Sequence, residues 1–216
     1  DAVRALVCGA SAVDAGDLDL VIERDAFAAV SEVVIRSRRF AGSIVRRHPA
    51  FLTMSITLPS GVRFDLARAR AERYAGPGSL PTVRPGTVAD DIRRRDFTVN
   101  AVCVRWDPAV GVYQVLDPSG GIGDIRRRVL RVFHPASFRD DPTRILRAMR
   151  FASTLGYAVE RRTLDLLRAA VRAESMRTVS PARRIGEFLT LLRKGRNLDV
   201  AAALMERWGV ASCFDR

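Results

Sequence analysis

The stretch Asp17-Leu18-Asp19-Leu20-Val21-Ile22 decides the fold of this chain. Acidic and apolar side chains alternate in it, and it is rich in branched aliphatic residues, which predicts a β-strand with one buried face. Side chains two residues apart on a strand point the same way and lie about 6.6 Å apart. We therefore expect Asp17 and Asp19 on one face and Leu18, Leu20 and Ile22 on the other.

Two neighbouring carboxylates on one face of a strand repel each other and resist burial. A divalent cation removes both costs, and Mg²⁺ is commonly held by one or two carboxylates together with substrate phosphates. One pair of carboxylates can also serve two ions about 3.5–4 Å apart. The pattern therefore indicates a Mg²⁺ site at Asp17 and Asp19. It is also typical of a solvent-exposed strand edge that carries two acids for solubility, and this alternative stays open.

The composition limits the class of protein. At 216 residues with 48% hydrophobic residues, the chain suits one large globular domain or two small ones. The three cysteines are few, odd in number and widely spaced, which favours a reducing compartment, so we expect a cytoplasmic protein. The two histidines are far apart, which excludes a His-rich zinc site. No apolar run is long enough to cross a bilayer, and we expect no membrane partner.

The formal net charge of +12 is the clearest global feature. It indicates a polyanionic partner, with nucleic acid or a nucleotide ahead of a membrane surface. Almost all of the positive charge is arginine, because Lys194 is the single lysine. A general preference for arginine would produce the same excess, so the charge alone does not decide the partner.

The order of predicted elements indicates an α+β chain with two domains. A mixed β-sheet with flanking helices should occupy residues 1–134, and helices alone should occupy residues 135–216. A long loop without periodicity is expected over residues 73–91. The helix over residues 26–36 has Asp25 as its expected N-cap. The expected strands cover residues 43–46, 51–58, 62–67, 99–106, 112–116 and 129–133, and the expected helices after residue 140 cover about 141–154, 160–174, 181–194 and 197–208.

Asp65 lies on the strand predicted over residues 62–67. The alternation places Val62, Phe64 and Leu66 on one face and Arg63 and Asp65 on the other. Asp65 is therefore a candidate third acid beside Asp17 and Asp19. The same alternation also describes a surface ion pair with Arg63, and both alternatives stay open.

A dense basic run, Arg93-Arg94-Arg95-Asp96, precedes the strand that begins near Val99. Arginine forks bind phosphate or a ribose edge through two parallel hydrogen bonds. Asp96 can hold one guanidinium in place, and Asn100 can offer its amide to a sugar hydroxyl. The alternative is a solvated basic face that Asp96 caps.

A second basic pattern opens the helical half of the chain. Either Asp140 or Asp141 should cap the helix, and Pro142 suits its first turn. Arg144, Arg147 and Arg150 recur every three residues, a spacing that turns by about −60° and climbs about 4.5 Å per step.

The three guanidinium groups should therefore line one curving face of the helix, where a bound anion would relieve their mutual repulsion. Asp141 and Arg144 together offer an acceptor beside a forked donor, which complements a cytosine edge. The alternative is an amphipathic helix with an arginine-rich outer surface.

Taken together, these stretches resemble the class II tRNA nucleotidyltransferases, the bacterial CCA-adding enzymes and their CC-adding and A-adding relatives. The bacterial poly(A) polymerases share the head and neck domains of that family, but residues 48–70 look more like the tRNA-modifying branch. The resemblance covers essentially the whole chain, and its matching stretches are Val3-Arg4, Asp17-Leu18-Asp19, His48–Phe51 with Thr53, Asp65–Arg70, Arg94–Ala101, Asp117-Pro118 with Gly121 and Asp124, and Asp141–Phe151 with Leu155-Gly156.

The resemblance implies a nucleotidyltransferase-type head over residues 1–134, followed by an all-α neck over residues 135–216. It implies transfer of CMP, AMP or both from CTP and ATP to the tRNA 3′ end, with release of pyrophosphate and a two-metal Mg²⁺ mechanism. Residues 73–91 match a flexible segment that helps the family to switch between C and A addition. The implied roles are metal binding and catalysis by Asp17 and Asp19, nucleotide contact by Arg4 and Arg95, base reading by Asp141 and Arg144, and triphosphate neutralisation by Arg147 and Arg150.

Three departures from the family pattern bear on this interpretation. Asp1 and Ala5 stand where the family has a Gly and an Asp, in the turn that approaches the phosphates, and Ala182 stands where it usually has Glu. We expect a preceding segment, because the first residues read as a helix already under way. The body and tail domains of the family have no counterpart before residue 216. A poly(A) polymerase and a catalytically silent RNA- or nucleotide-binding homologue remain alternatives.

Overall fold

The computed structural model describes residue 7, residues 17–23 and residues 26–214. Contacts divide the chain into two compact units. The first consists of Asp1–Arg73, Thr82–Arg95 and Asn100–Asp117, and the second of Tyr74–Pro81, Asp96–Val99 and Pro118–Arg216. The chain crosses between the units several times, so this division follows contacts rather than chain order. The assignment of residues 1–134 and 135–216 to two functional domains stays a prediction.

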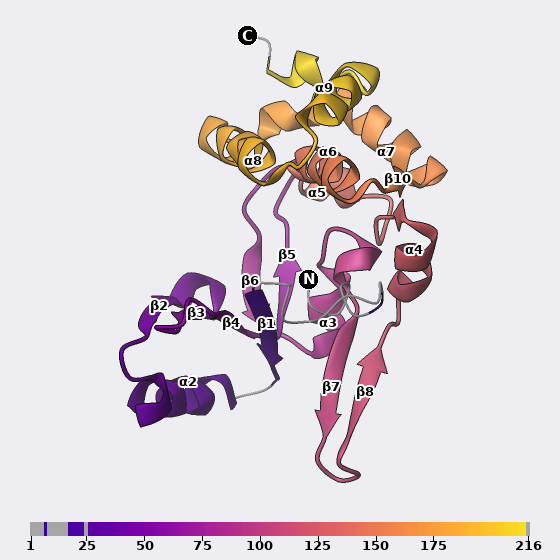
Figure 1. Ribbon diagram of the computed structural model, residues 1–216. Helices are drawn as coiled ribbons and strands as arrows, with labels where there is room; N and C mark the ends of the chain where they lie inside the picture. The colour runs from indigo at the N-terminus through magenta and orange to yellow at the C-terminus, as the bar shows by residue number, and fades with distance from the viewer. Residues whose placement is uncertain (1–6, 8–16, 24–25, 215–216) are drawn as a thin grey trace. The chain divides into compact units, whose positions relative to one another are not determined.

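A mixed sheet forms the centre of the first unit. Within the described residues its strands lie in the order β1 (Asp17–Ile22), β4 (Arg63–Arg68), β3 (Thr53–Thr57) and β2 (Ile44–His48). β1 pairs with β4 in parallel, whereas β4, β3 and β2 pair in antiparallel fashion. Helix α2 (Ala26–Arg36) packs under this sheet (Figure 1), and both β1 and α2 have the predicted bounds. The predicted N-cap Asp25 lies outside the described residues.

The core of this unit is made by one face of the sheet and α2. Val34 of α2 packs with Met54, Ile56 and Leu66, and all four side chains are buried. Leu18 and Leu20 of β1 are 39% and 41% exposed, so the prediction that β1 buries its whole apolar face is wrong. The reason is position, because β1 lies at the edge of the described sheet and the core cluster reaches it at Ile22.

The predicted loop over residues 73–91 is wrong in two places. β5 (Arg70–Arg73) and β6 (Thr82–Pro85) form a short antiparallel hairpin, and α3 (Val88–Arg93) follows it. The two strands have four residues each, and none of these residues is buried, so no apolar–polar alternation marks them. Helix α3 did carry a signal, the capping box in which Thr87 and Asp90 each accept a hydrogen bond from the other's backbone N–H.

The second hairpin is β7 (Cys103–Asp107) with β8 (Val112–Leu116), as predicted around residues 107–111. Two predicted strands begin later than expected because a 3₁₀ turn precedes each of them. The turn Pro49–Phe51 precedes β3, and the turn Thr98–Asn100 precedes β7.

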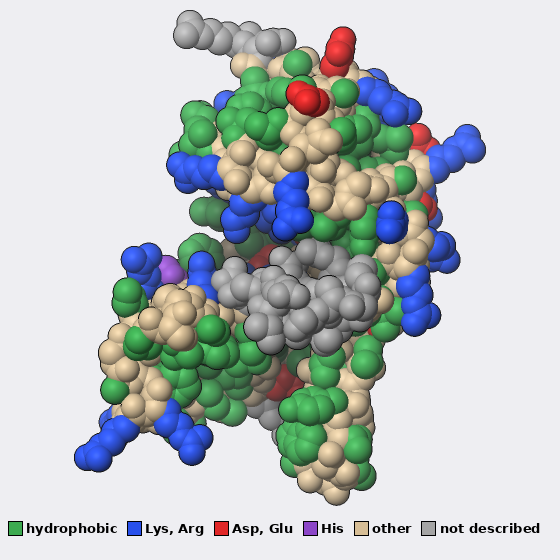
Figure 2. Space-filling model, in the orientation of Figure 1, with side chains coloured by type: hydrophobic (Ala, Val, Ile, Leu, Met, Phe, Trp, Pro, Cys, Tyr) green, Lys and Arg blue, Asp and Glu red, His purple; other side chains and the backbone are tan. Residues whose placement is uncertain are grey.

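Helices dominate the second unit, together with the short parallel pair β9 (Val129–Leu130) and β10 (Ala158–Val159). The four predicted helices are confirmed within three residues at each end, whereas the short helices α4 and α5 were not predicted. Figure 2 shows Lys and Arg side chains distributed over the helices of this unit. The bounds are α4 Gly121–Arg127, α5 Ser137–Asp140, α6 Arg144–Leu155, α7 Arg161–Arg172, α8 Pro181–Lys194 and α9 Leu198–Arg207.

The core of the second unit lies around α6. Ile145, Leu146 and Met149 of this helix are at most 1% exposed, and Phe97 is fully buried. The Phe97 ring meets the Phe151 ring edge to face, with 5.8 Å between the ring centroids. Among the described residues, no helix has both the length and the apolar composition needed to cross a membrane.

Gly86 lies in close contact with the backbone beside the β5–β6 hairpin, and a substitution at this position tests that packing. A Cβ at this position would lie 2.7 Å from the backbone N of Ala71 and 2.9 Å from the carbonyl carbon of Arg70. We expect Gly86→Ala to lower the free energy of unfolding by about 1–3 kcal/mol, because the backbone cannot yield as a side chain can. Gly76→Ala is the matched control, since its Cβ meets nothing within 4 Å. Equal thermal stability of the two variants would contradict this packing.

Asp124 of α4 is a buried carboxylate of the second unit that accepts several hydrogen bonds. Its side chain is 2% exposed and accepts hydrogen bonds from Thr98 Oγ1 at 2.6 Å, Arg127 Nη2 at 2.9 Å and Arg131 Nε at 2.9 Å. Burial alone would raise the pKa of Asp124, but these donors outweigh it, and the pKa lies below its ordinary value.

A carboxylate with a lowered folded pKa stabilises the fold above its unfolded pKa of about 3.9, and this stabilisation is lost as the pH falls through the folded pKa. We therefore expect Asp124→Asn to lower the free energy of unfolding at pH 7 by about 3 kcal/mol. The difference from the unchanged chain should shrink below about pH 4. Denaturant titrations between pH 7 and pH 3 measure it, and a difference that does not vary with pH would refute the assignment.

Candidate functional site

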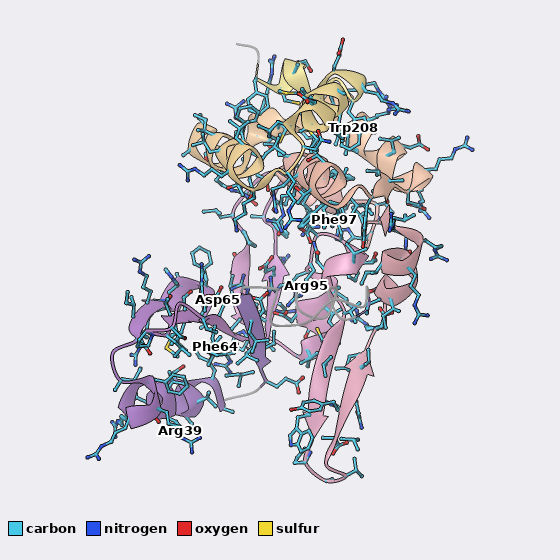
Figure 3. The ribbon with its side chains drawn as sticks, in the orientation of Figure 1. Arg39, Phe64, Asp65, Arg95, Phe97 and Trp208 are labelled. Carbon is cyan, nitrogen blue, oxygen red and sulfur yellow. The ribbon has the colours of Figure 1, made fainter. Side chains whose placement is uncertain are left out.

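The β1–β4 register brings two predicted acids together in the first unit. Asp19 is the direct partner of Asp65, and Asp17 is the partner of Arg63. Paired residues of neighbouring strands point to the same side of a sheet, so Asp19 and Asp65 share the face opposite the core. Asp19 is exposed and Asp65 is partly exposed, and Figure 3 labels Asp65 on β4. The Asp17 side chain and the whole of Arg4 lie outside the described residues.

Asp65 also has the surface partner that the alternative interpretation required. Arg63 Nη2 donates to Asp65 Oδ2 at 3.0 Å and to Oδ1 at 3.2 Å. Both interpretations of Asp65 are therefore compatible with the geometry, because the same carboxylate faces Arg63 along its strand and Asp19 across the pair. A cation that used Asp65 would have to displace the Arg63 guanidinium.

The donor set on this face suits a hard cation. It consists of carboxylate oxygens at exposed positions, which are the ligands that Mg²⁺ prefers. Among the described residues, no group of three or more His, Cys, Asp or Glu side chains is close enough to hold a metal ion. Asp17 is the predicted ligand that this statement leaves out, so the ligand pair Asp17 and Asp19 stays a prediction.

The basic run of the first unit is anchored rather than solvated at Arg94 and Arg95. Arg94 Nη2 lies 2.7 Å from Asp91 Oδ1, and Arg95 Nη2 lies 3.3 Å from Asp91 Oδ2. Asp91 is 1% exposed. Arg95 also donates through Nη1 to the carbonyl oxygen of Asn100 at 2.8 Å. Sequence reasoning missed Asp91, although its place three and four residues before the two arginines is the spacing of helical ion pairs.

Asp96 holds a guanidinium, as predicted, but that guanidinium belongs to Arg147 of α6, which is in the second unit together with Asp96. Arg147 Nε and Nη2 lie 2.8 Å and 2.5 Å from Asp96 Oδ2, while Asp96 Oδ1 accepts from the backbone N–H of Phe97 at 2.8 Å. Burial lowers the pKa of Arg147, but Asp96 and then Glu187 outweigh it, so the pKa is raised. Arg147 therefore stays charged inside the protein.

The three arginines of α6 occupy three different settings. Arg144 is 4% exposed and donates through Nη1 to Ser137 Oγ at 2.6 Å. Arg147 is paired with Asp96, and Arg150 lies over the Phe151 ring at 4.4 Å. The expected face of stacked, unrelieved positive charge is thus not what the structure has, because α5 and Asp96 supply local partners. The nucleotide-binding roles of these arginines stay predictions.

Asp141 does not cap α6, and the prediction that Asp140 or Asp141 does so is wrong. Its Oδ1 accepts from the Thr143 N–H at 3.2 Å and from Thr143 Oγ1 at 2.7 Å, which is a local turn, and the helix begins at Arg144. The same oxygen accepts from Arg183 Nη2 of α8 at 3.1 Å. Asp141 is therefore paired with Arg183, and its role with Arg144 at a base edge stays a prediction.

A pocket of about 290 Å³ opens around this ion pair in the second unit. Two carboxylates, two guanidinium groups, a hydroxyl and a glycine line it, namely Asp141, Glu187, Arg147, Arg183, Thr143 and Gly186. Two of the predicted nucleotide-binding residues, Asp141 and Arg147, thus meet in one pocket, and Arg144 and Arg150 are not among its lining residues. Sequence reasoning missed Arg183 and Glu187, whose separation of four residues places them on one face of α8.

Comparison with known proteins assigns the chain to a family. Residues 2–131 match the family described as the poly A polymerase head domain. An A-adding tRNA nucleotidyltransferase of Halalkalibacterium halodurans is 40% identical over 181 residues, which are 83% of this chain and 41% of that protein. A CC-adding tRNA nucleotidyltransferase of Deinococcus radiodurans is 35% identical over 196 residues, which are 91% of this chain and 50% of that protein.

Solved structures agree with these relatives. The apo form II of a CCA-adding enzyme matches 96% of this chain and 47% of its own chain, with 34% identity and a TM-score of 0.82. A tRNA nucleotidyltransferase in complex with a primer tRNA and an incoming ATP analogue matches 99% of this chain and 57% of its own, with 31% identity and a TM-score of 0.78. The chain therefore spans about half the length of these proteins. Because the family match covers more than half of its residues, the chain belongs to the poly A polymerase head-domain family.

Proposed function

We propose that this chain is the catalytic part of a tRNA nucleotidyltransferase. It transfers CMP, AMP or both from CTP and ATP to the 3′ end of tRNA, and pyrophosphate leaves. The observation that carries the proposal is the β1–β4 register, which sets Asp19 beside Asp65 on the exposed face of the sheet in a chain of this family. The similarity to A-adding and CC-adding enzymes supports the substrate class, and it does not choose between the two products.

Asp17 and Asp19 are the residues that would hold Mg²⁺. When bound there, the ion lowers the pKa of the RNA 3′-hydroxyl and neutralises charge on the triphosphate. The 3′-oxygen then forms a bond to the α-phosphorus while the bond to the pyrophosphate oxygen breaks. Asp65 can receive the hydroxyl proton on Oδ2 once Arg63 has released that oxygen.

The helices after residue 135 act in this proposal as the neck domain that selects the base. Asp141 and Arg147 line the pocket of the second unit, so we assign to it the edge of the incoming base. Arg144 supports the pocket from its buried position against Ser137. Arg4, Arg95, Asn100 and Arg150 are proposed to contact the phosphates or the ribose.

Arginines that are fixed by ion pairs within the protein suit phosphate binding. A guanidinium fixed by Asp91 or Asp96 loses less conformational freedom when it meets a phosphate than a free one does. Pre-organisation of this kind is how electrostatic catalysis avoids reorganisation during the reaction.

The carboxylates of β1 can be tested directly. We expect Asp17→Ala and Asp19→Ala, each made in the native protein, to reduce incorporation of labelled CMP or AMP into tRNA lacking its 3′ end to background, because phosphoryl transfer depends on charge neutralisation by the metal. Thermal unfolding should be unchanged, since Asp19 is exposed.

Glu32→Ala is the control for this experiment. Glu32 is an exposed acid of α2 that pairs with Arg36 and Arg47, so its loss should leave incorporation intact. Retained activity in Asp17→Ala or Asp19→Ala would remove the metal assignment. Long A-tails on arbitrary RNA ends, with no preference for tRNA, would instead make the protein a poly(A) polymerase.

A further inference from the structure

Glu187 of α8 carries a carboxylate oxygen whose hydrogen-bonding capacity is unused. Its Oε1 lies 3.7 Å from Arg147 Nη1, which is an ion pair but too long for a hydrogen bond. Its Oε2 is shielded from solvent and receives no hydrogen bond from any residue that the structure describes. A buried carboxylate oxygen that accepts no hydrogen bond is unfavourable inside a protein. A ligand that donates a hydrogen bond to this oxygen would remove that cost.

Two other carboxylate oxygens at or near the pocket are already engaged. Asp141 Oδ1 receives three hydrogen bonds, from the N–H and the hydroxyl of Thr143 and from Arg183. Asp96 is occupied by Arg147 and by the Phe97 N–H. Glu187 Oε2, by contrast, is a shielded carboxylate oxygen that receives no hydrogen bond from a described residue, so it has capacity for a donor on a ligand.

The rest of the lining defines what that ligand must offer. Arg147 and Arg183 stand beside Glu187, and their positive charge disfavours a cationic ligand. A neutral group that pairs an N–H donor with a neighbouring acceptor fits a carboxylate next to a guanidinium. Cytosine presents its N4 amino group beside N3, and adenine presents its N6 amino group beside N1. Uracil and guanine place a carbonyl oxygen at the same position, which a carboxylate repels.

The size of the pocket agrees with a base edge. About 290 Å³ is just below the roughly 300–1,000 Å³ typical of small-molecule sites, so the pocket suits a base rather than a whole nucleoside triphosphate. A rotation about the last side-chain torsion exchanges Oε1 and Oε2. Either oxygen can therefore face a base while the other stays near Arg147.

We propose that Glu187 is a further specificity-determining residue, and that its carboxylate accepts a hydrogen bond from the exocyclic amino group of the incoming CTP or ATP. This inference rests on the proposed function. It explains how one pocket accepts both cytosine and adenine and rejects uracil and guanine, because only the first two carry the amino donor.

The test uses Glu187→Gln in the native protein, with Glu206→Gln on the exposed surface of α9 as the matched control. Two readouts are needed, namely equilibrium binding of CTP, ATP, UTP and GTP, and incorporation of each into tRNA lacking its 3′ end. The amide offers both a donor and an acceptor, so we expect the preference for CTP and ATP over UTP and GTP to fall about tenfold to a hundredfold in both readouts. Glu206→Gln should keep the original preference.

A second variant, Glu187→Asp, tests whether a loss of folding, rather than a loss of base recognition, causes the change in nucleotide preference. It keeps the charge near Arg147 but withdraws the carboxylate by one methylene, so the preference should again fall while the melting temperature holds. Unchanged preference in both Glu187 variants would overturn the inference, even if the protein adds nucleotides normally. A protein that binds CTP and ATP selectively through Glu187 but incorporates neither would support the inference and refute the proposed function.

Discussion

The parallel pairing of β1 with β4 is the constraint on which the proposed catalytic site depends. It fixes Asp19 opposite Asp65 on one face and places Leu66 with the α2 core on the other. A slip of one residue would turn every side chain of β1 to the opposite face and break the acidic pair. Ile22 of β1 packs against the buried cluster of Met54, Ile56 and Leu66, and such a slip would turn its side chain away from that cluster.

Ion pairs between arginines and buried aspartates are the second feature on which the proposed site depends. The net charge of +12 suggests a surface of free cations, but the arginines of the predicted site that the structure describes each have a local partner. Asp91 fixes Arg94 and Arg95 in the first unit, and Asp96 fixes Arg147 in the second. Breaking a buried pair of this kind leaves an uncompensated charge, so both partners stay in place. The result in each unit is a set of guanidinium groups with defined directions.

Local patterns were sufficient to predict most of the elements. A few neighbouring residues are enough to show the alternation of β1 and the turn between β7 and β8. The same holds for the periodicity of α2 and of the four long helices. The hairpin β5–β6 and the helices α4 and α5 were missed, because segments of four to seven residues carry too little periodicity. Among the missed elements, α3 carried a local signal, the capping box at Thr87 and Asp90.

The candidate site was less predictable because its partners are distant in the sequence. Asp96 and Arg147 are 51 residues apart, and Asp141 and Arg183 are 42 residues apart. The spacing of α6 placed three arginines on one helix but could not show that Ser137 holds Arg144 or that Arg150 lies over Phe151. Nor could it show Glu187 in the pocket, since helix spacing gives no information on what α8 faces.

A crystal structure of the native protein with Mg²⁺ and a non-hydrolysable CTP analogue tests the central claim most directly. The account predicts electron density for Mg²⁺ between the triphosphate and the carboxylates of Asp17 and Asp19, on the sheet face that also carries Asp65. A triphosphate bound elsewhere, with Asp17 and Asp19 free of metal, would contradict it.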